Sequence, residues 1–220
     1  MTGSRESMLD RIRAALADAS PAERPNELPI DRTYRMKDPR SRTELVDQFI
    51  ERVHEYKATV SKVAAADLPR AIAAACAVRG VRQLVVPADL PSDWLQLPSG
   101  VSLLREPGLS NDQLEQSDGV LTACALGIAQ TGTIVLDCGP GQGRRAITLL
   151  PDFHLCVIRP YQIVGLVPEA IAHLRSSAAA PGRPITFISG PSATSDIELN
   201  RVEGVHGPRT LEVLVVMTNE

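Results

Sequence analysis

The residues whose types and spacing best suit binding or catalysis lie in glycine-rich, arginine-bearing turns between Ala129 and Arg209. The first turn, Thr131-Gly132-Thr133, offers two hydroxyls and consecutive backbone N–H groups around a glycine that tolerates positive φ. Such a turn suits phosphate or carboxylate oxygens. An ordinary strand-entry turn is the alternative, because glycine and threonine are common in turns. We predict that these turns together form an anion-binding surface.

The second segment, residues 139–145, reads Gly-Pro-Gly-Gln-Gly-Arg-Arg. It is not a dinucleotide fingerprint, because its third glycine is displaced and a strand-like run follows where a helix should begin. Gly143 gives the loop freedom to present Arg144 and Arg145. Successive strand side chains point to opposite faces, so we expect one arginine to clamp an anion and the other to face solvent or a carboxylate. A solvated surface role for both is the alternative.

The third segment, residues 189–198, reads Ser-Gly-Pro-Ser-Ala-Thr-Ser-Asp-Ile-Glu and follows an apolar, strand-like run. Ligands of α/β sheets bind beyond the carboxyl ends of strands, where this segment falls. Asp196 and Glu198 are candidates for acid and base, or for orienting Arg144, although a Ser-rich loop ending in Asp is also a plain helix cap. The candidate ligand-binding residues of this segment are Gly190, Ser192, Thr194 and Ser195.

The histidines and cysteines complete the candidate chemistry. His206 lies among glycines before the last apolar run and titrates near neutral pH, so it is a third acid–base candidate. His154 lies in the apolar run Phe-His-Leu-Cys-Val-Ile, which favours a buried, hydrogen-bonded core histidine. The cysteines are isolated in apolar runs and suit neither zinc nor an iron–sulfur cluster. We therefore expect neither a metal nor a cofactor.

Composition limits the classes of protein to which the chain can belong. Of 220 residues, 44% are hydrophobic and 22% charged, which is typical of a soluble globular domain. The net charge of −3 argues against nucleic-acid or anionic-membrane binding. We find no secretory signal and no bilayer-spanning run, so we expect a cytoplasmic protein. Because Lys37, Lys57 and Lys62 are the only lysines, an anion site must use arginine and backbone N–H groups.

The elements that would position these residues fall into two parts. Helical spacing of apolar residues predicts an amphipathic helix over residues 4–19, and a Pro-rich, charged strap runs from Pro21 to Arg40. We therefore divide the chain into 1–40 and a single α/β domain at 41–220. The leading helix would pack on its own domain, on a second copy in a homo-oligomer, or on a partner.

Within the main part, Ser41 and Glu44 form a capping box for a helix, and Asp67 opens another that Gly80 closes. The helix and strand signals alternate up to residue 86, which points to a parallel, layered sheet. The C-terminal half is rich in strand signals, so we expect an α/β domain with a layered, mixed sheet overall. The expected strands are 58–63, 83–86, 120–126, 133–137, 146–150, 154–158, 185–189 and 211–216. One later helix is expected at 168–175.

Four segments taken in order, AQTGTIVLD, GQGRRAITLLPDFHLCVI, QIVG and ITFISGPSATSDIELNRVEGVHGPRTLEVLVV, resemble the LUD-domain family, in its lactate utilization protein C type. The resemblance covers about residues 40–216. It implies a fold related to the sugar-phosphate isomerase, glucosamine-phosphate deaminase and CoA-transferase superfamily. It also implies a role with two iron–sulfur partner proteins that oxidise L-lactate to pyruvate. Many relatives carry an acid where this chain has Gln130, and an amide is no general base.

Since the chain offers no cluster ligands, we expect a non-redox accessory subunit that binds a small anion. The alternative is a stand-alone enzyme acting on a phosphorylated sugar or an acyl-CoA, with Asp196, Glu198 or His206 as acid or base. A third interpretation is a structural adaptor whose loops bind protein. Charge reversal at Arg144 separates the last interpretation from the other two, because anion binding would survive it only in an adaptor.

Overall fold

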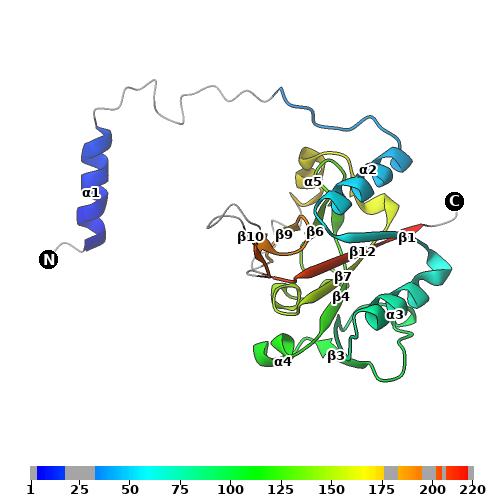
Figure 1. The fold of residues 1–220 in the computed structure, drawn as a ribbon. Helices are drawn as coiled ribbons and strands as arrows, with labels where there is room; N and C mark the ends of the chain where they lie inside the picture. Colours follow the sequence, from blue (N-terminus) through cyan, green and yellow to red (C-terminus); the bar gives the residue numbers. More distant parts are fainter. Residues whose placement is uncertain (1–3, 18–32, 176–182, 195–201, 205–206, 218–220) are drawn as a thin grey trace. The chain divides into compact units, whose positions relative to one another are not determined.

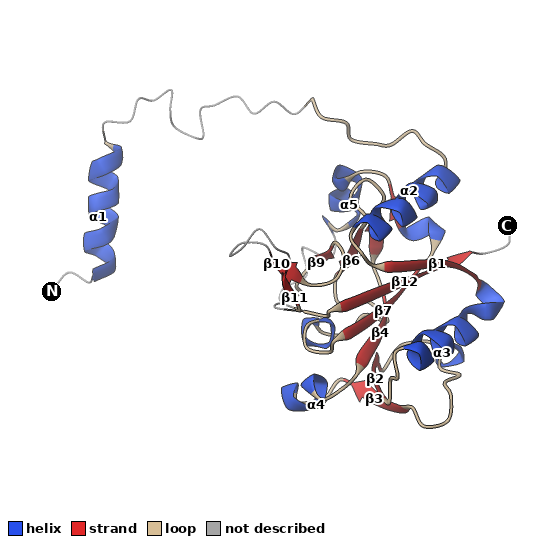
Figure 2. Cartoon of the chain, viewed as in Figure 1, coloured by secondary structure: helices blue, strands red, loops and turns tan. Residues whose placement is uncertain are grey.

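The structure is a computed structural model that describes residues 4–17, 33–175, 183–194, 202–204 and 207–217. The chain divides into two compact units, Met1–Arg35 and Met36–Glu220. The first contains helix α1 (Ser4–Leu16), which has no buried residue. Figure 1 shows the chain, and Figure 2 its helices and strands.

The second unit begins before the boundary expected at residue 40, because Asp38 is already part of its packing. The backbone N–H of Asp38 donates to the Glu169 carboxylate at 3.4 Å. The Asp38 side chain, 1% exposed, forms an ion pair with Arg40 at 2.6 Å. A Cβ at Gly165 would overlap Asp38, so the backbone at residue 165 approaches this aspartate closely. The end of the predicted strap is thus anchored to the domain.

The second unit is an α/β structure around a six-stranded sheet. Every neighbouring pair in this sheet is parallel. The strand order is β1 (Thr59–Ala64), β12 (Thr210–Met217), β7 (Phe153–Ile158), β4 (Gly119–Ala123), β2 (Gln83–Pro87) and β3 (Ser102–Glu106). The α/β class expected from the sequence is confirmed, but the large sheet is parallel rather than mixed.

A smaller sheet contains the antiparallel pairs. In order, its strands are β8 (Ile163–Val164), β5 (Leu126–Ile128), β6 (Thr133–Leu136) and β9 (Thr186–Ile188). Strand β5 is parallel to β8 and antiparallel to β6, which is in turn antiparallel to β9. A two-stranded ladder joins β10 (Ala193–Thr194) to β11 (Val202–Glu203). The single predicted strand at 120–126 is therefore two strands that belong to different sheets.

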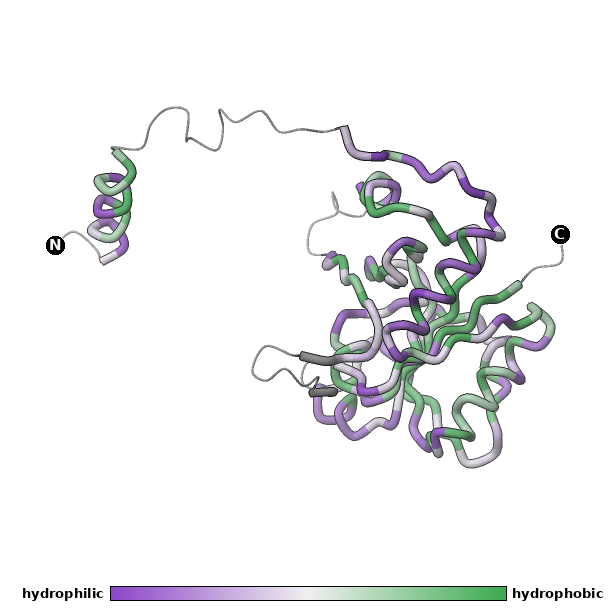
Figure 3. Tube along the Cα trace, turned by 45° about the horizontal axis from the view of Figure 1, so that its top comes forward, coloured by the Kyte–Doolittle hydropathy of each residue, from purple (hydrophilic) through white to green (hydrophobic). Residues whose placement is uncertain are grey.

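Alternation along the buried strands sorts the core into layers on the two faces of the large sheet. Leu214 and Val216 of β12 pack in the cluster under helix α3 (Leu68–Val78). Val213 and Val215 pack in the cluster that includes Phe49 of helix α2 (Arg42–Glu55). Successive strand residues point to opposite faces, so one strand serves both layers. Figure 3 shows the hydrophobic residues of these strands in the middle of the unit.

Local signals account for the helix boundaries. The predicted capping box is confirmed, since the Ser41 side chain accepts from the Glu44 N–H and the Glu44 side chain accepts from the Ser41 N–H. Gly80 follows α3 with φ of +65°, as the predicted helix stop requires. Helix α5 (Val167–His173) lies close to its predicted range. Helix α4 (Asn111–Glu115), which we did not predict, has its own capping box from Ser110 and Gln113.

One predicted strand is wrong. Residues 146–150 contain no strand, and Arg145–Thr148 instead form the 3-10 helix η4. The Ile147 N–H donates to the Arg144 carbonyl at 3.2 Å, and the Arg145 side chain donates to the Thr148 carbonyl at 2.9 Å. These short-range hydrogen bonds close a turn that the apolar run alone does not reveal.

Candidate functional site

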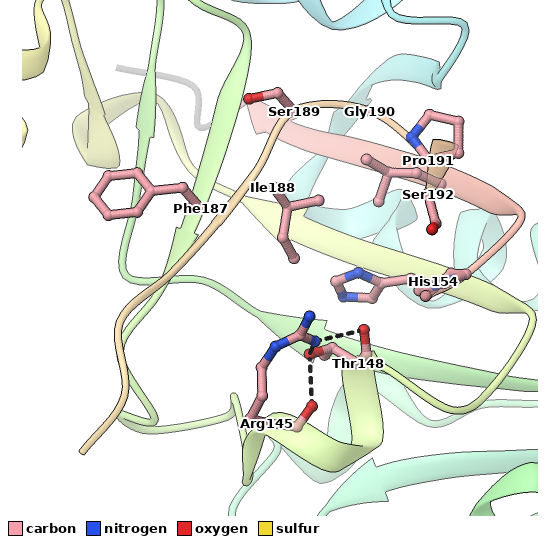
Figure 4. A pocket seen from close by; sticks show the side chains of 12 residues that line it. Arg145, Thr148, His154, Phe187, Ile188, Ser189, Gly190, Pro191 and Ser192 are labelled. Atoms are coloured by element: carbon pink, nitrogen blue, oxygen red, sulfur yellow. Dashed lines mark hydrogen bonds between the residues drawn. The ribbon is translucent and has the colours of Figure 1, made fainter. Parts of the chain in front are cut away.

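A pocket of about 210 Å³ lies at the amino ends of strands β7 and β12. His154 of β7 and Leu211 of β12 are paired in register and both line it. We call it the Arg145 pocket, and Figure 4 shows it from close by. Its lining residues are Arg145, Thr148, His154, Phe187, Ile188, Ser189, Gly190, Pro191, Ser192, Gly207, Pro208 and Leu211.

Arg145 supplies the charge of this pocket. Its Nη1 donates to the carbonyl oxygen of Thr148 at 2.9 Å and to the Thr148 hydroxyl at 3.0 Å, which fixes the guanidinium within η4. None of the ion pairs between described residues involves Arg145. Burial lowers the pKa of Arg145, so its charge is partly desolvated. A partly desolvated guanidinium with free donors binds carboxylate or phosphate oxygens strongly.

His154 lies beside this charge and is held neutral. The imidazole is 1% exposed, and its Nε2 lies 2.8 Å from the hydroxyl of Thr122, which is also buried. Burial first, and then the positive charge of Arg145, lower the pKa of His154 to about 3. The predicted core histidine is thus confirmed as buried and hydrogen-bonded. Its place at the pocket is new, because it depends on the register between β7 and β12.

The Thr131-Gly132-Thr133 turn supports one wall of the pocket from behind. The Thr133 hydroxyl lies 2.8 Å from the Ser189 hydroxyl and 2.7 Å from that of Thr131. Gly132 has φ of +57°, and a Cβ there would come within 2.6 Å of the Arg52 backbone in α2. The glycine is therefore required by its contact with α2, and the hydroxyls already have partners. Figure 4 shows the Ser189 hydroxyl directed away from His154.

The adjacent arginines of the second segment point into different pockets. Arg144 donates through Nε to the Glu106 carboxylate and through Nη2 to the Leu109 carbonyl at 2.5 Å. The Glu106 side chain is 3% exposed, so Arg144 neutralises a buried acid. Gly143 and Arg144 line a separate pocket beside Glu106. Arg144, the residue at which charge reversal was expected to abolish anion binding, is thus the arginine that faces a carboxylate. Arg145 lines the Arg145 pocket, and its binding of an anion stays a prediction.

The third segment contributes its first half to the Arg145 pocket. Gly190, with φ of +84°, and Ser192 both line it, and a Cβ at Gly190 would come within 2.7 Å of the Tyr56 side chain. Thr194 belongs to β10. Four of the predicted site residues lie outside the described residues: Ser195, Asp196, Glu198 and His206.

In the described parts of the chain, no three His, Cys, Asp or Glu side chains gather as a metal site would require. None of the described helices combines the length and apolar character needed to cross a bilayer.

Similarity to known proteins identifies the family of this chain. The LUD domain profile matches residues 46–216. Lactate utilization protein C of Deinococcus radiodurans is 49% identical over 95% of this chain and 93% of its own length. Lactate utilization protein C of Shouchella clausii is 30% identical over 98% of this chain and 99% of its own length.

A solved structure agrees with these matches. The crystal structure of a DUF162 family protein from Deinococcus radiodurans superposes with a TM-score of 0.70 at 46% identity, covering 81% of this chain and 100% of that one. The chain therefore belongs to the LUD domain family, as the resemblance in its sequence predicted.

Proposed function

We propose that this protein is a non-redox accessory subunit of a cytoplasmic, iron–sulfur L-lactate-oxidising system, and that it binds a small anion in the Arg145 pocket. Two relatives that match nearly the whole chain are named lactate utilization protein C, which supports a role associated with lactate utilization. Electron transfer is assigned to iron–sulfur partner proteins. The anion-binding role is assigned to this chain.

The observation that carries the proposal is the guanidinium of Arg145, which lines the pocket and forms no ion pair with a described residue. The pocket volume of about 210 Å³ is smaller than the roughly 300–1,000 Å³ of sites for drug-sized ligands. It therefore suits an anion of a few heavy atoms, such as lactate, pyruvate or phosphate. Gly190 and Ser192 line the same pocket and contribute a backbone segment and a hydroxyl to its wall.

The state of His154 favours binding over acid–base chemistry. Its pKa of about 3 lies far below neutral pH, and an effective acid or base needs a pKa near the working pH. The neutral imidazole also adds no second positive charge, so among the described residues that line the pocket the guanidinium of Arg145 alone provides the positive charge that attracts the anion. The alternative, an enzyme for a phosphorylated sugar or an acyl-CoA, depends on kinship with the isomerase, deaminase and CoA-transferase superfamily and on Asp196, Glu198 or His206.

The first test is calorimetric titration of the protein with L-lactate, pyruvate and inorganic phosphate. We expect at least one to bind, and Arg145→Gln to weaken it about 10- to 100-fold, because a charge-assisted hydrogen bond contributes about 1.5–3 kcal/mol. Arg105→Gln is the matched control, since Arg105 is exposed and lies outside the pocket. Equal affinity in the two variants, or no binding of any of the three anions to the wild type, would refute the anion site.

The second test separates the accessory role from the alternatives. A strain whose only copy carries Arg145→Gln should grow poorly on L-lactate and normally on glucose, and Arg105→Gln should grow normally on both. Deletion of the gene without any growth defect on L-lactate, in a strain lacking a paralogue, would overturn the role. Turnover of sugar phosphates or acyl-CoA that is lost in Asp196→Asn or Glu198→Gln would support the enzyme instead.

A further inference from the structure

A second cavity, of about 560 Å³, lies at the carboxyl ends of strands of the large sheet, whereas the Arg145 pocket lies at their amino ends. Ala123 ends β4, Arg159 directly follows β7, and these strands are neighbours through the pair Ala123↔Val157. The cavity therefore opens at the carboxyl ends of parallel strands, where α/β proteins usually bind ligands. We call it the Arg159 cavity; it is lined by Ala123, Cys124, Ala125, Leu126, Asp137, Pro140, Gln142, Arg159, Tyr161, Gln162, Val164, His173 and Leu174.

The Arg159 guanidinium lies over the ring of Trp94 and has no hydrogen-bond acceptor among the described residues. Its Cζ lies 5.4 Å from the ring centroid of Trp94, which is 4% exposed. Its guanidinium donates no hydrogen bond to a described residue and forms no ion pair with one. A hydrogen bond with Cys156 and burial raise the pKa of the Cys124 thiol, whereas the positive charge of Arg159 lowers it. The charge of Arg159 therefore reaches into the cavity that Cys124 lines.

Three other polar groups of the wall already have partners. The Asp137 carboxylate accepts from the Gly139 N–H at 3.0 Å and from Gln142 Nε2 at 2.9 Å. The Gln142 amide oxygen accepts from the Asp137 N–H at 2.7 Å. Gln162 donates to the Cys124 carbonyl at 2.6 Å. These bonds shape the wall, while the stacked fork of Arg159 keeps its donors for a ligand.

We propose that the Arg159 cavity binds an organic anion of cofactor size. Its phosphate or carboxylate would lie on the Arg159 guanidinium, and an apolar body would lie against Leu126, Val164 and Leu174. The cavity volume of about 560 Å³ falls within the roughly 300–1,000 Å³ of sites for such ligands. The negative charge of Asp137 on the same wall restricts the anionic group to the Arg159 end. This site is distinct from the Arg145 pocket and does not depend on the proposed function.

Trp94 makes the proposal directly measurable, because it is the only tryptophan of the chain and contacts Arg159. The protein is titrated with adenosine 5′-monophosphate, which presents a phosphate, and with 4-phenylbutyrate, which presents a carboxylate. We expect at least one to change Trp94 fluorescence saturably, and the probe that does so identifies the anionic group. Arg159→Gln should weaken that binding about tenfold or more, as loss of a charge-assisted pair implies.

Three variants control the result. Arg79→Gln is the matched control, because the Cζ of Arg79 lies 5.7 Å from the Phe153 ring and Arg79 does not line the cavity. Its affinity should equal that of the wild type. Arg159→Lys keeps the charge and loses the fork, so a several-fold loss is expected there even if Arg159→Gln does not fold. Arg145→Gln should leave the Trp94 response unchanged, which separates this site from the proposed function.

Calorimetric titration with the same two probes is the second measurement. The proposal would be overturned if neither of the two probes produced heat or a fluorescence change. So would unchanged affinity in Arg159→Lys or Arg159→Gln, or an equal loss in Arg79→Gln.

Discussion

Lowering the pH from about 7 to about 5 should reduce the free energy of unfolding through the buried imidazole of His154. An ordinary histidine has a pKa of about 6.5, and burial together with Arg145 lowers that of His154 to about 3. Between these two pKa values the imidazole of His154 is protonated in the unfolded chain but not in the folded protein. Stability therefore falls as the pH drops through this window. Because pH 5 lies about 1.5 units below the ordinary value, linkage gives a loss of about 2 kcal/mol.

Urea unfolding followed by Trp94 fluorescence provides the measurement, because the buried Trp94 becomes exposed on unfolding. The wild type and His154→Gln are each unfolded at both pH values. The glutamine amide retains a partner for the Thr122 hydroxyl but does not titrate. The free-energy difference between the two pH values should be about 2 kcal/mol larger in the wild type than in the variant.

Comparing differences cancels the other titrating groups. Burial raises the pKa of Glu212, so its contribution to the free energy of unfolding increases as the pH falls. This effect is opposite in sign to that of His154. Glu212 is present in both proteins and drops out of the comparison. An equal pH dependence in the wild type and in His154→Gln would refute the reasoning, since it would mean that the folded imidazole protonates as readily as the unfolded one.

Two further predictions concern stability. Gly132→Ala should cost more than Gly80→Ala in thermal unfolding, by about 1 kcal/mol or more, because both have positive φ but only Gly132 faces backbone within 2.6 Å; equal losses would contradict the close contact with α2. Glu106→Gln should destabilise by about 1–3 kcal/mol in urea unfolding, because it removes the buried negative charge that pairs with Arg144. Asp47→Asn, which breaks an exposed pair, should cost less than about 1 kcal/mol, and the reverse order would show that burial does not matter here.

Much of the fold could be predicted because its elements have strong local signals. Ser41 and Glu44 mark the start of a helix by residue type and spacing alone, and Gly80 marks the end of another. The apolar runs at 154–158 and 211–216 predict buried strands, but not that they are parallel neighbours. That pairing joins segments distant in sequence, and periodicity within either segment carries no information about it. The helix–strand alternation indicated parallel strands in the first half of the chain, but the sheet as a whole was expected to be mixed for this reason.

The elements that were missed depend on contacts outside their own sequence. The run 146–150 is apolar enough for a strand, but the side chain of Arg145 closes it into a 3-10 helix by binding Thr148. Strand β3 was not predicted, and with it the acid Glu106 that pairs with Arg144. The sequence therefore indicated that the adjacent arginines would differ in role, but not which of them would pair with a buried acid and which would line the Arg145 pocket.

The candidate site was predicted in part. Arg145, Gly190 and Ser192 were expected to bind a ligand, and they line one pocket. The Thr131–Thr133 turn was expected to contact the ligand directly, whereas its hydroxyls bond to one another and to Ser189. The binding of an anion by these residues stays a prediction. The contribution of His154 required the three-dimensional register and had no sequence signal beyond a polar residue within an apolar strand.

The position of β12 has a consequence for synthesis of the protein. Thr210–Met217 form the last strand described along the chain, yet β12 lies inside the large sheet between β1 and β7. While the chain is still on the ribosome, β1 lacks its partner and β7 presents an open edge, both of which invite pairing with other chains. A nonsense mutation shortly before residue 210 should therefore yield aggregates rather than a shortened but folded domain, because the missing piece is an inner strand and not a peripheral one.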